Sequence, residues 1–151
     1  MRRYGVQSDL ALGLWIKLAR AYSTFNRLAN NSIRQFGLTQ PQFGVLECLG
    51  HLGPQTIGQL TRKLLSTGGN MTVVIDNLEK DGLVYRANSK EDRRATVVRL
   101  TPKGKNLFDH IFPTHAEEIT RLASVLSEQE QQELGRLLKK LGLTLQKNSE
   151  G

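Results

Sequence analysis

The sequence SKEDRRATVVRLTPKG, Ser89 to Gly104, joins a run of charged residues, Lys90 to Arg94, to an alternating run of branched residues. Alternation with a period of two predicts a short strand over Ala95 to Leu100. A first strand near Leu83 to Ala87 would pair with it, so the polar residues from Asn88 to Arg94 are predicted to form the tip of a β-hairpin. The hairpin therefore carries a cluster of mixed charge at its exposed end.

A helix is predicted to begin directly after the hairpin. Thr101 is the expected N-cap, and Pro102 occupies the first helical position, where a backbone N–H would have no helical partner in any case. The apolar periodicity continues past Pro113, around which this long helix is expected to bend. A last helix, capped by Ser127 with Glu130, follows, and its apolar seam consists of Leu134, Leu138, Leu141 and Leu145.

Three shorter helices are predicted ahead of the hairpin. Thr39 and Thr56 are each followed three residues later by glutamine, which indicates a capping box at the start of the first two. A turn from Leu65 to Thr67 leads into the third, and the second and third together make a helix-turn-helix. Gly68 and Gly69 fall in the first turn of the third helix, where they either let the backbone approach a partner closely or relieve a crowded turn.

A long N-terminal helix, expected from about Ser8 to Phe36, carries a single apolar stripe. This stripe and the C-terminal seam have no partner within one small lobe, and a second copy related by two-fold symmetry is the simplest cover. The predicted fold class is mainly α with a small β-hairpin wing. A winged helix-turn-helix lobe, residues 38–101, is flanked by a helical dimerisation region, residues 1–37 and 102–151. The predicted dimerisation residues are Leu10, Leu14, Leu134, Leu138, Leu141 and Leu145.

The overall charge favours a polyanionic partner. The 151 residues include 21 Lys+Arg and 14 Asp+Glu, for a formal net charge of +7 and a pI near 9.9. Between Arg86 and Lys105, seven basic residues stand against Glu91 and Asp92, so seven minus two leaves +5 in the hairpin and its exit. Charge is therefore concentrated where a groove could accept it.

Cysteine content and hydropathy favour the cytoplasm. The single cysteine, Cys48, excludes an internal disulfide. No run of about 18 uncharged apolar residues occurs, so no membrane span is expected. Gly13, Lys17 and Arg20 interrupt the first apolar stretch, so a signal peptide is not expected either.

From Leu38 to Gly104 the sequence resembles the MarR family of winged-helix regulators. The segments LTQPQFGVLECL, TIGQLTRKL and MTVVIDNLEKDGLVYR carry this resemblance. The most specific segment is DRRATVVRLTPKG, which fits the family's D-x-R wing signature followed by leucine-threonine and glycine. The resemblance implies a homodimeric transcriptional regulator, expected to be a repressor. Its terminal helices would interlock, and its winged lobes would bind a pseudopalindromic operator in double-stranded DNA.

Asp92 and Arg94 match the two fixed places of the wing signature. The resemblance implies that Arg94 enters the minor groove, whose negative potential attracts a guanidinium, and that Asp92 orients it or a neighbouring arginine. Asn70 is the expected base reader, because its amide can pair bidentately with adenine. Many relatives carry arginine at the positions of Val73 and Asn77, and this chain does not, so no operator sequence is transferred. The predicted DNA contacts are Ser66, Thr67, Gly68, Gly69, Asn70, Thr72, Lys90, Asp92, Arg93 and Arg94.

A ligand cleft is expected between the N-terminal helix, the start of the next helix and the long helix after the hairpin. A mostly apolar cleft suits a small aromatic or phenolic effector that relieves DNA binding. STGGNMT, followed by IFPTHAEEI, resembles a branch that includes regulators responding to quinones and other aromatic compounds. The expected lining is Trp15, Tyr22, Phe36, Phe43, Phe108, Phe112 and His115; the alternative is that these side chains fill the core.

Other functions find less support in the sequence. No recognisable catalytic constellation is present, so neither an enzyme nor a cofactor is expected. His110 and His115 are five residues apart and do not share a helical face, so a metal-responsive regulator is a less favoured alternative. Cys48 has apolar neighbours and is expected to be an inert core thiol and not a redox sensor. A basic module that binds a protein partner is the remaining alternative.

Overall fold

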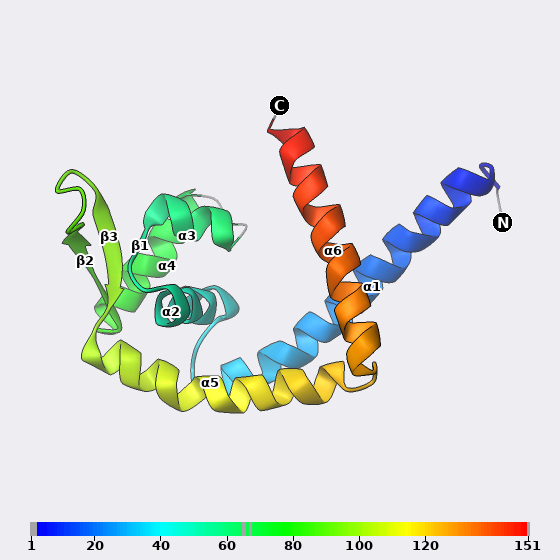
Figure 1. Cartoon of the computed structure of the whole chain (residues 1–151). Helices are drawn as coiled ribbons and strands as arrows, with labels where there is room; N and C mark the ends of the chain where they lie inside the picture. The colour runs from blue at the N-terminus through cyan, green and yellow to red at the C-terminus, as the bar shows by residue number, and fades with distance from the viewer. Residues whose placement is uncertain (1–2, 65, 67, 151) are drawn as a thin grey trace.

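Helix α5 (Pro102–Ala123) is the element along which the rest of the chain is arranged, as Figure 1 shows. One half of it carries a lobe of short helices and a small sheet, and α1 and α6 extend from its other half. The computed structural model describes residues 3–64, 66 and 68–150. The other elements are α1 (Val6–Arg34), α2 (Gln40–Leu52), β1 (Gln55–Thr56), α3 (Ile57–Lys63), α4 (Gly68–Lys80), β2 (Val84–Asn88), β3 (Thr96–Leu100) and α6 (Glu128–Ser149). The predicted fold class, mainly α with a small β wing, is confirmed.

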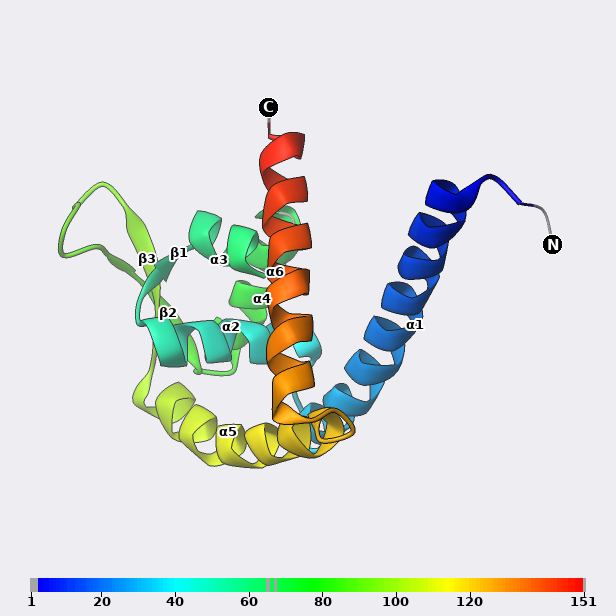
Figure 2. The same cartoon turned by 45° about the vertical axis from the view of Figure 1, so that its right-hand side comes forward.

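Local capping signals fix the starts of four helices as predicted. Thr39, Thr56 and Ser127 each accept a hydrogen bond from the backbone N–H three residues on, and that residue's side chain bonds back to the N-cap N–H. Thr101 Oγ1 accepts from the Gly104 amide at 3.0 Å, and Pro102 follows it in the first turn. α1 begins and ends two residues earlier than predicted. It ends at Arg34 because the chain turns there, ahead of Gly37, whose φ is 74°. Pro113 lies inside α5, which curves along its length (Figure 2).

The sheet has one strand more than the sequence predicted. β2 and β3 form the expected antiparallel hairpin, with Val84 opposite Leu100 and Asn88 opposite Thr96. β1 pairs with the other edge of β3, with Gln55 opposite Val98, so the strand order is β1-β3-β2. A strand of two residues has no periodicity to read, and only its pairing with β3 defines it.

The core lies where α2, α4, the sheet and α5 meet. Side chains from all these elements are fully buried, so the lobe and the first half of α5 pack as one unit. Gly50 of α2 faces the ring of Phe108 of α5 so closely that an added Cβ would come within 2.5 Å of it. The largest fully buried side chains are Val45, Leu46, Leu60, Met71, Ile75, Leu78, Val84, Val98 and Ile111.

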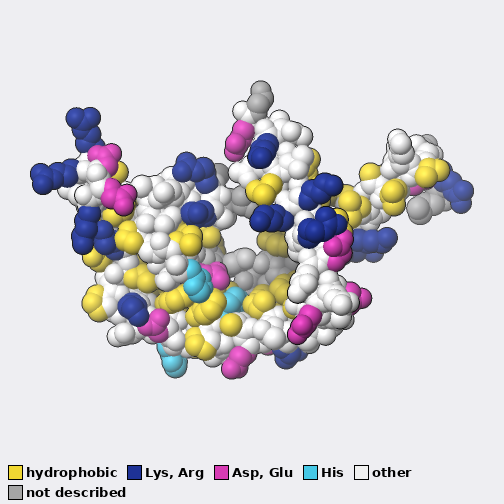
Figure 3. Space-filling model, viewed as in Figure 1, with side chains coloured by type: hydrophobic (Ala, Val, Ile, Leu, Met, Phe, Trp, Pro, Cys, Tyr) yellow, Lys and Arg dark blue, Asp and Glu magenta, His cyan; other side chains and the backbone are white. Residues whose placement is uncertain are grey.

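The two terminal helices leave much of their apolar surface uncovered. α6 stands clear of the lobe in Figure 1 and clear of most of α1 in Figure 2, and none of its described residues is buried. α1 buries only Ala29, Ser32 and Ile33, all near its C-terminal end. Hydrophobic side chains lie along the outer part of α1 and on α6 in Figure 3. Among the described helices, none combines the length and apolar character that crossing a membrane requires.

Candidate nucleic-acid interface and effector cavity

The hairpin tip holds its charged side chains in solvent. Lys90, Asp92, Arg93 and Arg94 are all exposed, and basic side chains gather at the tip at the upper left of Figure 3. The Asp92 carboxylate accepts a hydrogen bond from the Arg94 backbone amide at 3.0 Å. Ser89 Oγ accepts from the Asp92 amide at 3.4 Å. Asp92 therefore fixes the backbone from which Arg94 projects, and no hydrogen bond joins its carboxylate to a guanidinium among the described residues.

Helix α4 presents the predicted base-reading residues on its outer face. Met71 and its apolar neighbours along the helix are buried, which turns Asn70 and Thr72 toward solvent. Ser66, ahead of the helix, is half-buried, and Thr67 lies outside the described residues. The Thr72 hydroxyl donates to the Gly68 carbonyl at 2.9 Å, which stabilises the first turn.

Gly68 and Gly69 are both exposed in that first turn. An added Cβ at either glycine would meet no atom of the described residues within 4 Å. Neither glycine is therefore needed to avoid a clash with the described residues of the lobe. This favours the other interpretation, in which the glycines let the backbone approach a partner closely.

An ion-pair cluster that the sequence reasoning missed joins the wing to α4. Arg86 of β2 bonds Asp76 of α4 at 2.7 Å and also pairs with Glu79, whose carboxylate accepts from the Arg86 backbone amide at 3.0 Å. The hydrogen bond to Asp76 raises the pKa of the Arg86 guanidinium. Arg86 thus sets the angle between hairpin and helix, and its charge is balanced within the lobe. Residues seven and ten positions apart gave no signal for this cluster in the sequence.

A cavity of about 610 Å³ lies between α1, α2, α5 and the start of α4. This volume is within the range of small-molecule sites. Tyr22, Phe43 and His115 line the cavity as the sequence predicted. Six polar residues that were not among the predicted lining residues also line it: Asn26, Asn30, Gln40, Glu47, Ser66 and Asn70.

The other four predicted lining residues lie elsewhere. Phe36 packs edge-on against His110, with ring centroids 6.0 Å apart. Phe108 and Phe112 pack around His51 at 5.2 and 4.5 Å. These three side chains follow the alternative reading, in which aromatic residues fill the core. Trp15 is on the outer part of α1, with 66% of its surface exposed.

His115 is the titratable ring of the cavity. Its Nδ1 lies 3.5 Å from Ser32 Oγ, and its ring packs on Phe43 with centroids 4.6 Å apart. Burial lowers the pKa of His115, and the Glu47 carboxylate opposes this only in part, so the ring is neutral near neutral pH. His110 packs instead on Phe36, so the two histidines of the metal alternative have different surroundings.

Cys48 is also titratable, and the sequence predicts that it is a core thiol and not a redox sensor. Its side chain belongs to the core, and burial raises the pKa of the thiol. A thiol kept protonated is a poor nucleophile, which matches the interpretation of Cys48 as a core residue.

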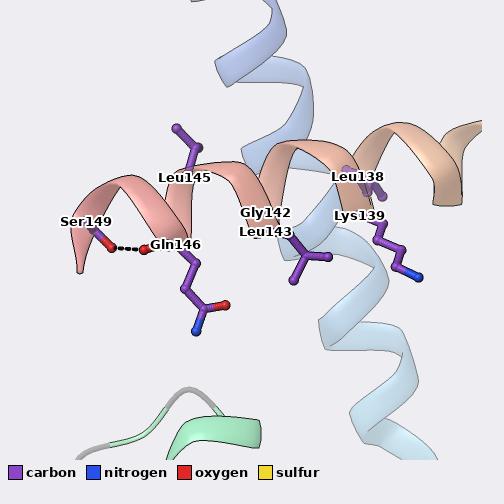
Figure 4. A pocket seen from close by; sticks show the side chains of 7 residues that line it. All are labelled: Leu138, Lys139, Gly142, Leu143, Leu145, Gln146 and Ser149. Atoms are coloured by element: carbon purple, nitrogen blue, oxygen red, sulfur yellow. Dashed lines mark hydrogen bonds between the residues drawn. The ribbon is translucent and has the colours of Figure 1, made fainter. Parts of the chain in front are cut away.

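The predicted dimerisation residues are mostly exposed. Leu10, Leu14, Leu134, Leu138 and Leu145 each expose 40% or more of their surface, and Leu141 is half-buried. A shallow groove runs along α6 and is lined by residues of that helix alone, with the apolar Leu143 among them (Figure 4). Leu137 and Leu143 are exposed as well, so the apolar surface of α6 is wider than the predicted seam.

The sequence and the fold are similar to those of known proteins. A model of the MarR family matches residues 38–96. The HTH-type transcriptional regulator MhqR of Bacillus subtilis is 42% identical over 136 residues, which cover 90% of this chain and 94% of that protein. AbsC, a MarR family transcriptional regulator from Streptomyces coelicolor, shares the fold with a TM-score of 0.80 at 21% identity, over 97% of this chain and 99% of that one.

One solved structure also concerns a small ligand. It describes a mechanism for regulation of DNA binding of Bordetella bronchiseptica BpsR by 6-hydroxynicotinic acid. BpsR is 27% identical to this chain, with a TM-score of 0.75, and the match covers 86% of this chain and 98% of that one.

Proposed function

Because this chain belongs to the MarR family of transcriptional regulators, we propose that it is a homodimeric repressor of a pseudopalindromic operator, released by a small aromatic or phenolic effector. The resemblance read from the sequence is confirmed, and the chain is a DNA-binding regulator and not an enzyme. The proposed location is the cytoplasm, where such a regulator would meet its operator.

The DNA-binding proposal rests on two exposed elements of the same lobe, the first turn of α4 and the hairpin tip. The first turn of α4 presents Asn70, and the hairpin tip presents Arg94. Arg86 ties the two elements together through Asp76 and Glu79. A helix that enters the major groove beside an arginine that enters the minor groove needs this fixed geometry.

The exposed leucines of α1 and α6 support the dimer proposal. The exposed leucines of both helices would be removed from water in an interface between two copies. Two lobes held in this way can bind half-sites about one helical turn apart, which is the reason for expecting a pseudopalindrome.

Control of DNA binding by a ligand is supported by the residues that line the cavity at the start of α4. Ser66, Asn70 and Met71 line it together with residues of α1, α2 and α5. A compound in the cavity would therefore contact the segment proposed to read bases. The compound can release DNA only if it binds more tightly to an arrangement of the lobes that does not fit the operator. A coupling free energy of about 1–3 kcal/mol between ligand and DNA binding would weaken operator affinity roughly five- to 150-fold.

Replacing Arg94 by alanine is expected to weaken operator binding by about 1–3 kcal/mol. The salt dependence should also fall by about one counterion, because one phosphate-proximal cation is removed. Fluorescence anisotropy with labelled operator DNA across a salt series measures both quantities. Arg121→Ala is the matched control, because Arg121 is an exposed arginine near the far end of α5 that pairs with Glu118. Equal affinity and equal salt slope for Arg94→Ala and Arg121→Ala would show that the wing does not contact DNA.

Replacing Asn70 by alanine is expected to act differently. The side-chain amide that pairs with a base would be lost while the phosphate contacts remain, so discrimination between bases should fall by about 1–3 kcal/mol at the affected position. Binding to operators with single base changes, measured for both proteins, checks this. An unchanged preference at every position would exclude Asn70 as a base reader.

A further inference from the structure

The outer face of α4 carries one exposed apolar residue, Val73. This valine exposes 58% of its surface, and the other exposed residues of α4 are polar or glycine. The buried stripe of the helix consists of Met71, Ile75 and Leu78. At about 3.6 residues per turn, Val73 lies on the side of the helix opposite to that stripe. It therefore sits near the middle of the face that α4 turns to solvent.

Gly69 leaves the N-terminal side of Val73 open. Side chains of an α-helix lean toward its N-terminus, so the Val73 side chain lies over the turn that contains Gly69 and Asn70. A longer side chain at position 69, four residues earlier on the same face, would cover the valine methyl groups. An added Cβ at Gly69 would meet no atom of the described residues within 4 Å, so packing in the lobe does not explain this glycine. The result is a bare apolar spot beside Asn70.

The charges around this spot allow a polyanion to approach it. Asp76 is the one acidic residue among the exposed residues of α4, and Arg86 bonds its carboxylate at 2.7 Å, which balances the charge. Lys80, also exposed, lies two turns beyond Val73 on the same face. The major groove of B-DNA is wide enough to admit a helix, and the one apolar group that its base pairs present there is the 5-methyl group of thymine.

We infer that Val73 is a specificity-determining residue that contacts the 5-methyl group of a thymine in the operator. The inference rests on base reading by α4, proposed above, and adds a thymine to the adenine expected for Asn70. Residues three apart on a helix have Cβ atoms about 5–6 Å apart, and base pairs are stacked about 3.4 Å apart. The thymine therefore lies within about two base pairs of that adenine. Cytosine has no methyl group, so the contact distinguishes T·A from C·G.

Removing the methyl group from the DNA tests the inference without changing any Watson–Crick hydrogen bond. The probe is the duplex that the full chain selects from a randomised pool, synthesised with each thymine in turn replaced by deoxyuridine. Fluorescence anisotropy gives each affinity. At one thymine position we expect the replacement to weaken binding about fourfold, the effect of taking one methyl group out of an apolar contact. 5-Bromodeoxyuridine at that position should restore the affinity, because bromine fills the space of the methyl group.

The variant Val73→Ala shortens the apolar side chain and should leave α4 folded, because the position is exposed and alanine favours a helix. In this variant deoxyuridine at the same position should weaken binding less than about twofold, because the two changes remove the same contact. Val125→Ala is the matched control. Val125 is 86% exposed between α5 and α6, outside the winged lobe, so the fourfold loss should persist in this control.

Thr72 carries the other methyl group among the exposed side chains of α4. Thr72→Ser removes that methyl group and keeps the hydroxyl that donates to the Gly68 carbonyl. The loss caused by deoxyuridine should persist in Thr72→Ser as well. If Thr72→Ser abolishes the loss and Val73→Ala does not, the thymine contact belongs to Thr72 and the inference is wrong.

Two further results would overturn the inference. They are a selected duplex in which no thymine responds to replacement, and a loss that is unchanged in Val73→Ala. Asn70→Ala, measured on duplexes with single base changes, separates this failure from that of the proposed function. Altered base preference in Asn70→Ala with a silent deoxyuridine series would leave base reading by α4 standing and refute the role of Val73. If both are silent, base reading by α4 fails, and the inference fails with it.

Discussion

Replacing Leu138 and Leu141 together by glutamate is expected to prevent dimerisation. In a two-fold interface each change occurs twice, so four carboxylates would enter a surface that is apolar in the original chain. Burying unpaired charge is strongly unfavourable, and we expect dimer dissociation to become at least about 100-fold easier. Sedimentation velocity over a concentration series measures the dissociation constant directly. In the proposed complex paired lobes bind the two half-sites, so operator affinity should fall as the dimer dissociates.

A matched pair of substitutions on the other side of α6 distinguishes an effect on the interface from an effect on the stability of the helix. Gln132→Glu with Lys140→Glu places the same residue type at exposed positions away from the seam. The control should remain a dimer, and its helix content by circular dichroism should match that of the seam variant. If the seam variant is a tight dimer with unchanged helix content, the interface lies elsewhere.

Replacing Gly104 by alanine is expected to lower the free energy of unfolding by about 3 kcal/mol. Gly104 is in the first turn of α5, where alanine would ordinarily strengthen a helix by about 1 kcal/mol. Here an added Cβ would lie 1.9 Å from the carbonyl oxygen of Leu83 and 2.9 Å from its carbonyl carbon. That oxygen accepts the Thr101 amide at 3.1 Å, so backbone must move and a junction hydrogen bond must stretch. The clash therefore outweighs the gain in helix propensity.

Urea unfolding at a fixed protein concentration measures the Gly104 effect. Gly58→Ala is the control, because Gly58 is also in the first turn of a helix and an added Cβ would meet neighbours no closer than 3.8 Å. It should unfold within about 1 kcal/mol of the original chain. A Gly104→Ala variant with the same midpoint as Gly58→Ala would show that the Leu83 backbone yields easily at this junction.

Local patterns in the sequence were sufficient for the elements whose cause is local. The capping boxes at Thr39, Thr56 and Ser127 depend on a residue and its third neighbour, and all three form as predicted. The hairpin follows from alternation on both sides of a polar tip. The wing signature then identified the family, because its residues are contiguous.

What depends on distant residues was decided only by tertiary structure. β1 exists because Gln55 lies beside Val98, and two residues alone have no period that could announce it. Seven aromatic residues were expected to line one cleft, but helix α5 turns Phe108 and Phe112 toward His51, and of its three predicted residues it turns His115 alone toward the cavity. Glu47 reaches the same cavity from α2, and nothing in its local sequence distinguishes it from a carboxylate in open solvent. The sequence determined the helices, the hairpin and the family of this protein, and the packing of α1, α2 and α5 determined the charge of its cavity, because that charge depends on which faces three separate helices turn toward one another.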